Sequence, residues 1–368
     1  MANDNDYTGL GVNSQGVFLI GAEGGNPPHL AILHRRNLTT GAIEWTAYDD
    51  EIEFSNNSSS GEDAMRCAVD DDYLYVSGFS DLGDFDGWRM QRRSLSDGSI
   101  LRNVTSQPGD NNCYPSNLTL NDSNVFFTGS VERSAPAEKG WRIECRDKTL
   151  LGLVWFKEYV FATTKDGIPF DACANSTHVF IAGYEEDDIN GFIWRVECRL
   201  ASDGSLVWTR NVTTTNSQST ARAITIYGDA LFVMGEGDVS GSFKLFVKKL
   251  KVSDGTDYGG GWSDNVFTQQ LLVFCSYPCS LSANEYGLFA LGTEYKTGAP
   301  ASRIFQRKKI NMTTGADMWV ANSANYGGTI YSYAMKIAAH LQGVYLCGIV
   351  LYNTSPFGSN AYVQKVRA

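Results

Sequence analysis

The chain has 368 residues, 43% of them hydrophobic and 12% aromatic, which is enough for one large packed domain or two ordinary ones. A net charge of −11 argues against nucleic acid and anionic membranes as partners, because both require clustered Lys and Arg. No apolar run reaches about 18 residues, so no membrane span is expected. The polar start MANDNDYTGL has no signal-peptide pattern, so either the protein is cytosolic or a leader is absent from the given sequence.

A five-residue apolar segment that ends in glycine recurs along the whole chain. Its seven copies are VFLIG (17–21), LYVSG (74–78), VFFTG (125–129), VFIAG (179–183), LFVMG (231–235), LFALG (288–292) and VYLCG (344–348). The closing glycines are 51 to 57 residues apart. A regular period of this length is typical of a repeat architecture.

Every copy lies between the same neighbouring patterns. An alternating segment and a tight turn precede it, as in NLTLNDSNVFF and AITIYGDALFV, and this predicts a hairpin. A variable loop and a second predicted hairpin follow it, at 33–45, 88–102, 194–208 and 305–319 among others. The turns S-D-G-[ST] and T-T-G-A place glycine where positive φ is needed. Each unit therefore predicts four short strands, and no segment shows a helical period.

Repeated four-stranded antiparallel units predict an all-β fold, a seven-bladed β-propeller. A linear stack would need atypical capping units at its ends, which the sequence lacks. We expect a single domain over residues 1–368, with approximate blades 1–50, 51–107, 108–160, 161–213, 214–268, 269–321 and 322–368. Blade 7 ends with its third strand at 361–368, so it is predicted to be incomplete. It is then a three-stranded blade, the end of a fragment, or a blade completed by a neighbouring molecule.

The repeat consensus, G-x-V-Y-V-x-G-Y, a loop, then F-V-x-K-x-x-x-D-G-x-x-x-W, resembles the SBBP-type seven-bladed β-propeller repeat proteins of bacteria and archaea. The resemblance covers essentially the whole chain. It implies the propeller fold and, for most such proteins, an extracellular location. Its motifs are structural and imply no catalytic residue.

Two further features predict an extracellular or cell-surface glycoprotein. The chain has eight cysteines and ten N-x-[ST] sequons, more sequons than its composition alone would give. The glycosylation sites we expect are Asn37, Asn103, Asn211 and Asn311. The Cys275–Cys279 pair is the one local disulfide predicted, because repeat-equivalent cysteines in different blades commonly lie too far apart to bond.

The loops that follow the repeated glycine segments are acidic. They contain Asp81, Asp84, Asp86, Glu132, Glu138, Glu185, Glu186, Asp187, Asp188, Glu236 and Asp238. All leave the same end of their blades, so we expect an acidic rim on one face of the ring. A D-x-[DNS]-G pattern recurs there and suggests a Ca²⁺ site with the oxygen ligands Asp84, Asp86, Asp188, Asn190 and Asp238. Asx turns that start the next strand are the simpler explanation of the same pattern.

Tryptophan recurs at two positions of the repeat. Trp88, Trp141 and Trp194 are expected to begin third strands, while Trp45, Trp155, Trp208 and Trp319 are expected to end fourth strands. A side chain that recurs in register is what packing between blades requires, so we interpret both sets as core. The four histidines form no predicted catalytic group, and no serine nucleophile elbow, P-loop or dinucleotide fingerprint is present.

These observations favour a binding or structural and assembly module that requires no cofactor. Its expected partners are a protein or carbohydrate ligand at the acidic rim and a second copy at the edge of blade 7. One alternative is an extracellular polysaccharide-acting hydrolase or lyase that uses channel-mouth carboxylates such as Asp63 and Asp110. The other alternative is a self-assembling surface filament protein.

Overall fold

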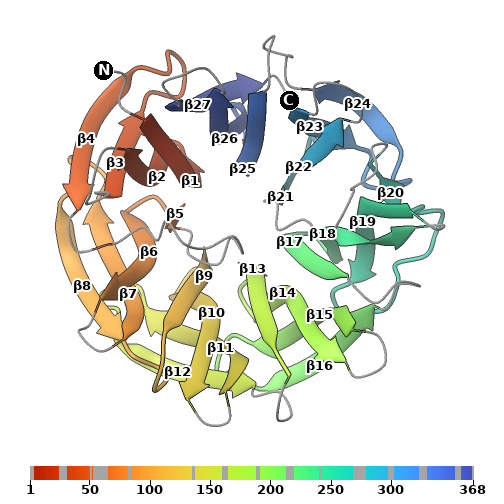
Figure 1. The fold of residues 1–368 in the computed structure, drawn as a ribbon, viewed down its shortest axis with the longest axis horizontal. Helices are drawn as coiled ribbons and strands as arrows, with labels where there is room; N and C mark the ends of the chain where they lie inside the picture. The colour runs from red at the N-terminus through yellow and green to blue at the C-terminus, as the bar shows by residue number, and fades with distance from the viewer. Residues whose placement is uncertain are drawn as a thin grey trace.

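In the computed structural model of the protein, the alternating segments form β-strands throughout (Figure 1). The structure describes residues 4–24, 31–49, 52, 65–81, 85–134, 137–159, 165–187, 191–212, 219–239, 242–267, 279–296, 302–322, 330–352 and 358–366. No helix occurs in these ranges. Consequently none of the described segments is a helix able to cross a membrane.

The strands fall into four sets according to their place in a blade. The first, innermost strands are β1 (Asp4–Asn13), β5 (Arg66–Val69), β9 (Cys113–Leu120), β13 (Gly167–Ala174), β17 (Thr220–Tyr227), β21 (Cys279–Asn284) and β25 (Ile330–His340). The second strands are β2 (Gly16–Gly24), β6 (Tyr73–Asp81), β10 (Asn124–Ser134), β14 (His178–Asp187), β18 (Ala230–Val239), β22 (Gly287–Lys296) and β26 (Gly343–Tyr352).

The third strands are β3 (Ala31–Arg36), β7 (Asp86–Ser94), β11 (Ala137–Asp147), β15 (Gly191–Leu200), β19 (Ser242–Lys251), β23 (Ser302–Ile310) and β27 (Gly358–Val366). The outer, fourth strands are β4 (Ile43–Asp49), β8 (Ile100–Ser106), β12 (Leu153–Tyr159), β16 (Leu206–Val212), β20 (Asn265–Val266) and β24 (Asp317–Asn322). Blade 7 has no fourth strand among the described residues, and its β27 is an outer edge.

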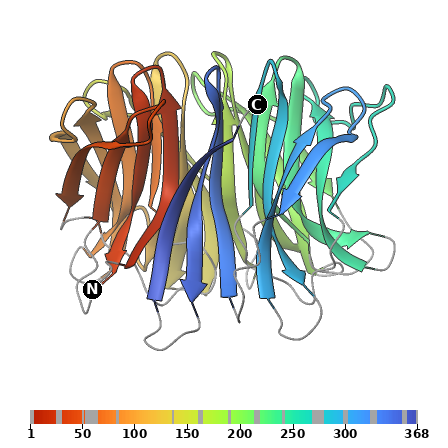
Figure 2. The ribbon, with the colours of Figure 1, turned by 90° about the horizontal axis from the view of Figure 1, so that it is seen from above.

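Consecutive strands of a blade pair antiparallel, and the seven blades stand around a common axis (Figure 1). The turns after first and third strands all lie at one end of the ring, which we call the hairpin face. The second and fourth strands end at the other, the loop face, where the chain passes to the third strand or to the next blade (Figure 2). The predicted seven-bladed β-propeller is confirmed.

The turn between third and fourth strands explains why most copies of the repeat have a glycine at this position. Gly41, Gly98, Gly204 and Gly315 have φ values of 72°, 74°, 73° and 78°. Only glycine adopts this left-handed backbone at little cost. Blade 3 has Leu151 there instead, at φ 56°. The predicted positive-φ turns are therefore correct.

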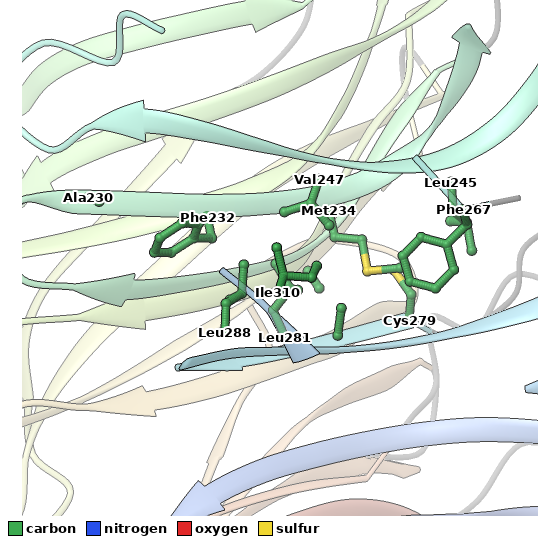
Figure 3. Close-up of a cluster of buried hydrophobic side chains, with 12 residues drawn as sticks. Ala230, Phe232, Met234, Leu245, Val247, Phe267, Cys279, Leu281, Leu288 and Ile310 are labelled. Carbon is green, nitrogen blue, oxygen red and sulfur yellow. The ribbon is translucent and has the colours of Figure 1, made fainter. Parts of the chain in front are cut away.

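The hydrophobic core is divided among the interfaces between blades. Seven clusters of buried side chains occur in the described part of the chain, one between each pair of neighbouring blades. Figure 3 shows the cluster between blades 5 and 6, where Phe232 and Met234 of β18 face Leu281 of β21 and Leu288 of β22. Sheets packed face to face in this way bury the apolar side of each alternating strand.

The repeated glycine and the third-strand tryptophan belong to a single packing device. A side chain at Gly183 would collide with the Trp141 indole of the preceding blade, and one at Gly235 would collide with that of Trp194. The Trp141 Nε1–H donates to the Tyr184 carbonyl at 3.0 Å. The Trp194 Nε1–H donates to the Glu236 carbonyl at 2.8 Å. In blades 3, 4 and 5 the repeated glycine thus makes room for the third-strand tryptophan of the preceding blade.

The fourth-strand tryptophans also join neighbouring blades. Trp45, Trp155 and Trp208 donate Nε1–H to the carbonyls of Leu95, Ala201 and Val252 in the next blade, at 2.9, 3.0 and 2.9 Å. The core interpretation of both tryptophan sets is correct. However, Trp45, Trp155, Trp208 and Trp319 lie near the start of their strands, not at the end. Each fourth strand continues past its tryptophan, the residue at which the sequence pattern predicted that the strand would end.

The ring closes by side-chain packing between blades 7 and 1, without a shared strand in the described residues. Tyr7, Leu10 and Leu19 pack against Tyr345 and Cys347. The Tyr345 hydroxyl and the Lys365 ammonium both donate to the Leu38 carbonyl, at 3.2 and 3.0 Å. The N-terminal strand β1 is the innermost strand of blade 1, so it does not complete blade 7.

Candidate functional site

The innermost strands bring one register-equivalent residue of every blade toward the ring axis. These residues pair with the position just before each closing glycine, and five of the blades have a β-bulge beside this position. They are Gly9, Arg66, Asn117, Asp171, Ala223, Ser280 and Lys336, which we call the axial layer. Polar and charged side chains thus meet at a depth where the rest of each blade is apolar.

Asp171 is the centre of the axial layer. Its Oδ1 accepts hydrogen bonds from the Asn117 amide and, at 3.1 Å, from the Lys336 ammonium of blade 7. Its Oδ2 accepts the Ile224 N–H of blade 5 at 2.9 Å. The carboxylate therefore connects four blades, and its ion pair with Lys336 joins two blades that are not neighbours.

Arg66 is the second cation of this layer. Its Nη1 donates to the carbonyls of Thr8 and Met65, at 3.0 and 3.3 Å. Burial lowers the pKa of Arg66 to about 10, and Asp171 acts in the opposite direction. The guanidinium stays protonated at neutral pH, so the layer holds two cations and one carboxylate.

Arg66, Asp171 and Lys336 were not among the predicted site residues, and Asn117 appeared only as part of a sequon. The sequence held a signal that would have found them. Counted from the closing glycines, these polar residues occupy one repeat position on strands that are otherwise apolar. The axial residues share only their distance from the closing glycine and no local motif, so they do not stand out as a site in the sequence.

A second polar arrangement lies between blades on the third strands. In blade 4, the Glu197 carboxylate is 1% exposed and accepts hydrogen bonds from Arg195 Nε at 2.8 Å and Arg199 Nε at 2.7 Å. Glu144 repeats this in blade 3, between Arg142 and Arg146. In blade 2, Gln91 and Arg93 share the Asp49 carboxylate supplied by blade 1.

We call these arrangements the charge ladders. Each of their buried carboxylates is paired with at least one guanidinium group and is therefore held as a counter-ion. Between blades 3 and 4 a cavity of about 10 Å³ lies beside Trp141, Arg142, Pro169 and Glu197. It has room for about one water molecule. The charge ladders are therefore structural.

The acidic rim is partly neutralised within the ring. Glu132 pairs with Lys139 at 2.8 Å, and Glu185 with Arg195 at 2.6 Å. Glu236 is 1% exposed and pairs with Arg222 at 2.9 Å. These carboxylates do lie toward the loop face, as expected, but they are turned toward cations of their own blades.

The proposed calcium ligands do not come together in the part of the chain that the structure describes. Asp84, Asp188 and Asn190 lie outside the described residues. The Asp86 carboxylate accepts a hydrogen bond from the Tyr114 hydroxyl at 3.2 Å, and Asp238 is 8% exposed. No group of three or more acidic, His or Cys side chains suited to a metal is found within the described ranges. Calcium binding stays a prediction.

The predicted glycosylation sites lie on the outer part of the ring. Asn37 and Asn311 cap the turns after β3 and β23, where their Oδ1 atoms accept backbone N–H groups. Asn103 and Asn211 lie on the fourth strands β8 and β16. The Asn37 amide donates to Glu44 at 2.9 Å and that of Asn211 to Glu185. Whether any of the four carries a glycan stays a prediction.

The cysteines are mainly core residues. Cys67, Cys113, Cys145, Cys173, Cys198 and Cys347 are free thiols. Burial raises the pKa of each, to about 12 for Cys145 and Cys198, so they remain protonated and unreactive. Cys275 lies outside the described residues, so its predicted disulfide with the buried Cys279 is untested.

The channel-mouth carboxylates suggested for catalysis find no support in the described residues. Asp63 lies outside them, and Asp110 is an exposed residue with interactions of its own. The one axial carboxylate they contain, Asp171, already accepts three hydrogen bonds. A general acid or base would need a carboxyl group free to exchange a proton.

No protein-family model and no curated protein matches the chain. Solved propeller structures do resemble it. A quinohemoprotein alcohol dehydrogenase from Comamonas testosteroni is 9% identical, with a TM-score of 0.55 over 100% of this chain and 68% of that chain. The β-propeller domain of the Trilobed protease from Pyrococcus furiosus is 10% identical, with a TM-score of 0.53 over 99% and 94%.

The polysaccharide lyase Uly1 is likewise 10% identical, with a TM-score of 0.53 over 98% of this chain and 89% of that chain. The Pyrococcus domain is described as having an open velcro topology. Proteins with such different activities share the ring of blades, and at these identities the likeness shows the fold alone.

Proposed function

We propose that the protein is an extracellular or cell-surface propeller that acts as a binding and assembly module, related to the SBBP-type repeat proteins. The observation that carries this proposal is the unpaired outer edge of blade 7. Six blades end in a fourth strand, whereas blade 7 ends at β27 among the described residues, so a third strand that is covered in the other blades is here the outer edge. An unpaired edge presents a row of free N–H and C=O groups to another chain.

The rest of the ring carries a surface that fits this edge. Apolar side chains are exposed along the outer strands of blades 2 to 4, which we call the outer apolar patch. It consists of Ile100, Leu101, Leu150, Leu153, Val154, Phe156, Leu206 and Val207, each between 43% and 60% exposed. Exposed apolar residues that recur on neighbouring edge strands mark an interaction surface.

A second copy of the chain is therefore the partner that we propose for the edge of blade 7. An outer strand of blades 2 to 4 in one copy would pair with β27 of the next copy. Because the two surfaces differ, the contact is head to tail and extends into chains of molecules instead of closing a dimer. The loop face is left free for a protein or carbohydrate ligand, as expected for loops that a rigid scaffold positions.

An engineered fourth strand tests the assembly proposal. Val366 occupies the register position of Ile310, so Arg367 and Ala368 can be replaced by a copy of residues 311–322, the turn and fourth strand of blade 6. This graft would pair with β27 within one molecule. We expect sedimentation velocity to show assembly of the parent that increases with protein concentration, and a monomeric graft variant.

The matched control carries a Gly/Ser extension of the same length and should assemble like the parent. A substitution on the opposite surface, Val154→Lys, should also give monomers. A parent that remains monomeric up to millimolar concentration would overturn the assembly proposal. Equal assembly of the graft and control variants would show that β27 is not the surface involved.

A polysaccharide-acting enzyme remains the alternative function. It requires two free carboxyl groups within about 10 Å of each other, as in glycoside hydrolysis. The pairing of Asp171 with Lys336 and Asn117 favours the binding module over this alternative. Release of reducing or unsaturated sugar ends from acidic polysaccharides by the purified chain would reverse that preference.

A further inference from the structure

The axial layer has an unbalanced charge. Arg66 and Lys336 are cations, and Asp171 is the only carboxylate whose charge bears on Arg66 in the described part of the chain. The Asp171 oxygens already accept bonds from Asn117, Lys336 and the Ile224 N–H, and Lys336 holds the carboxylate as its ion-pair partner. A positive charge held away from bulk water is costly unless an anion compensates it.

Arg66 has donors that no described group uses. Its Nη1 is held by two carbonyl oxygens, those of Thr8 and Met65. Its Nε and Nη2 have no acceptor among the described residues. The side chain is largely buried, with a small part exposed to solvent. Nε and Nη2 form the side of the guanidinium that binds a carboxylate with two parallel hydrogen bonds.

Both cations act on the same buried thiols. Burial raises the pKa of the Cys67 and Cys347 thiols, while Arg66 and Lys336 both act to lower it. Lys336 also acts on the thiols of Cys173 and Cys279 in blades 4 and 6, so its ammonium lies toward the middle of the axial layer, where it pairs with Asp171. Blade 1 contributes Gly9 to the axial layer, so it adds no side chain there.

We propose that the axial layer is a binding site for a small organic carboxylate, with the fork of Arg66 Nε and Nη2 as its anchor. A monoanion neutralises the single excess charge of the layer. A phosphate dianion would leave an excess negative charge beside Asp171, which disfavours it. A planar, two-oxygen group also matches the guanidinium fork, which a spherical halide does not.

Acetate is the probe for this site. Saturation-transfer NMR would measure its binding to the whole chain at fixed ionic strength, in a buffer that contains no halide. We expect binding to the parent and an at least tenfold weaker affinity for Arg66→Gln. The control is Arg102→Gln, which removes an exposed cation of β8 and should bind acetate like the parent.

Arg66→Lys keeps the charge and removes the fork, so it tests the site even if Arg66→Gln does not fold. It should also weaken acetate binding at least tenfold. Unchanged binding by a folded Arg66 variant, or no binding by the parent, would overturn the proposal. Displacement of acetate by an equal concentration of chloride would overturn the preference for a carboxylate.

Discussion

Blade 4 and blade 7 follow the same repeat, yet different interactions hold them in the ring. Blade 4 has four strands and buries Glu197 between Arg195 and Arg199. Glu197 lies two residues after the partner of the closing glycine, and at this register position blade 7 has the exposed Gln364. Blade 7 contributes instead Lys336, which reaches across the axis to Asp171.

The difference separates the two roles of charge in this protein. In blades 3 and 4 the charges are buried in pairs along one third strand, and in blade 2 Arg93 is buried against Asp49 of blade 1. In blade 7 the third strand β27 is the outer edge of its sheet. Its described polar side chains are exposed or contact a neighbouring blade. We therefore assign stability to the charge ladders and interaction to the edge of blade 7, and three measurements test this contrast.

The largest effect should come from the carboxylate of the blade 4 ladder. Glu197→Ala leaves the buried Arg199 without its counter-ion and Arg195 with Glu185 alone, and we expect a loss of about 3–5 kcal/mol in the free energy of unfolding. Chemical denaturation monitored by tryptophan fluorescence would measure it. The matched variant Gln364→Ala in blade 7 should change that free energy by less than about 0.5 kcal/mol. Equal costs for the two variants would contradict the contrast between the blades.

His34 occupies the same register position in blade 1 and should make stability depend on pH. Burial, and then the positive charge of Arg36, lower its pKa from 6.5 to about 4. The folded state therefore excludes a proton that the unfolded chain binds below pH 6.5. The stabilisation is complete above pH 6.5 and is lost as pH falls through 4.

The linked loss is roughly 3 kcal/mol between pH 7 and pH 4, because each pKa unit corresponds to about 1.4 kcal/mol. Urea unfolding at a series of pH values would measure it. In His34→Gln this part of the pH dependence should disappear, while that of the carboxylates remains. A parent and variant with parallel pH profiles would show that His34 is not responsible.

The smallest effect concerns the hydrogen bonds of the fourth strands, which blade 7 lacks altogether among its described residues. Trp208→Phe keeps most of the packing and removes the Nε1–H donor to the Val252 carbonyl. We expect a loss of about 1 kcal/mol in the free energy of unfolding. The control Trp88→Phe should lose less from hydrogen bonding, since the Trp88 Nε1 has no acceptor in the structure. A larger loss in the control would mean that packing, and not the bond, dominates.

The period of the closing glycines predicted the number of blades, and the two hairpin patterns in each unit predicted their strand count. Gly183 explains why: it must lack a side chain to admit Trp141, so the period records contact between neighbouring blades. The acidic loops were less predictable. Glu185 and Glu236 were expected on an open rim, but Arg195 and Arg222 pair with them from other strands. Such pairs depend on register, which local sequence does not reveal.

The sequence by itself determined the all-β repeat, the turn glycines and the recurrence of the tryptophans, because these follow from short-range periodicity and backbone sterics. Only the tertiary structure decided which charges meet. Asp171 and Lys336 are 165 residues apart in the chain and form an ion pair at 3.1 Å because closure of the ring brings blades 4 and 7 to a common axis. The same closure leaves Arg66 with unused donors near that axis, and this long-range geometry creates the candidate site.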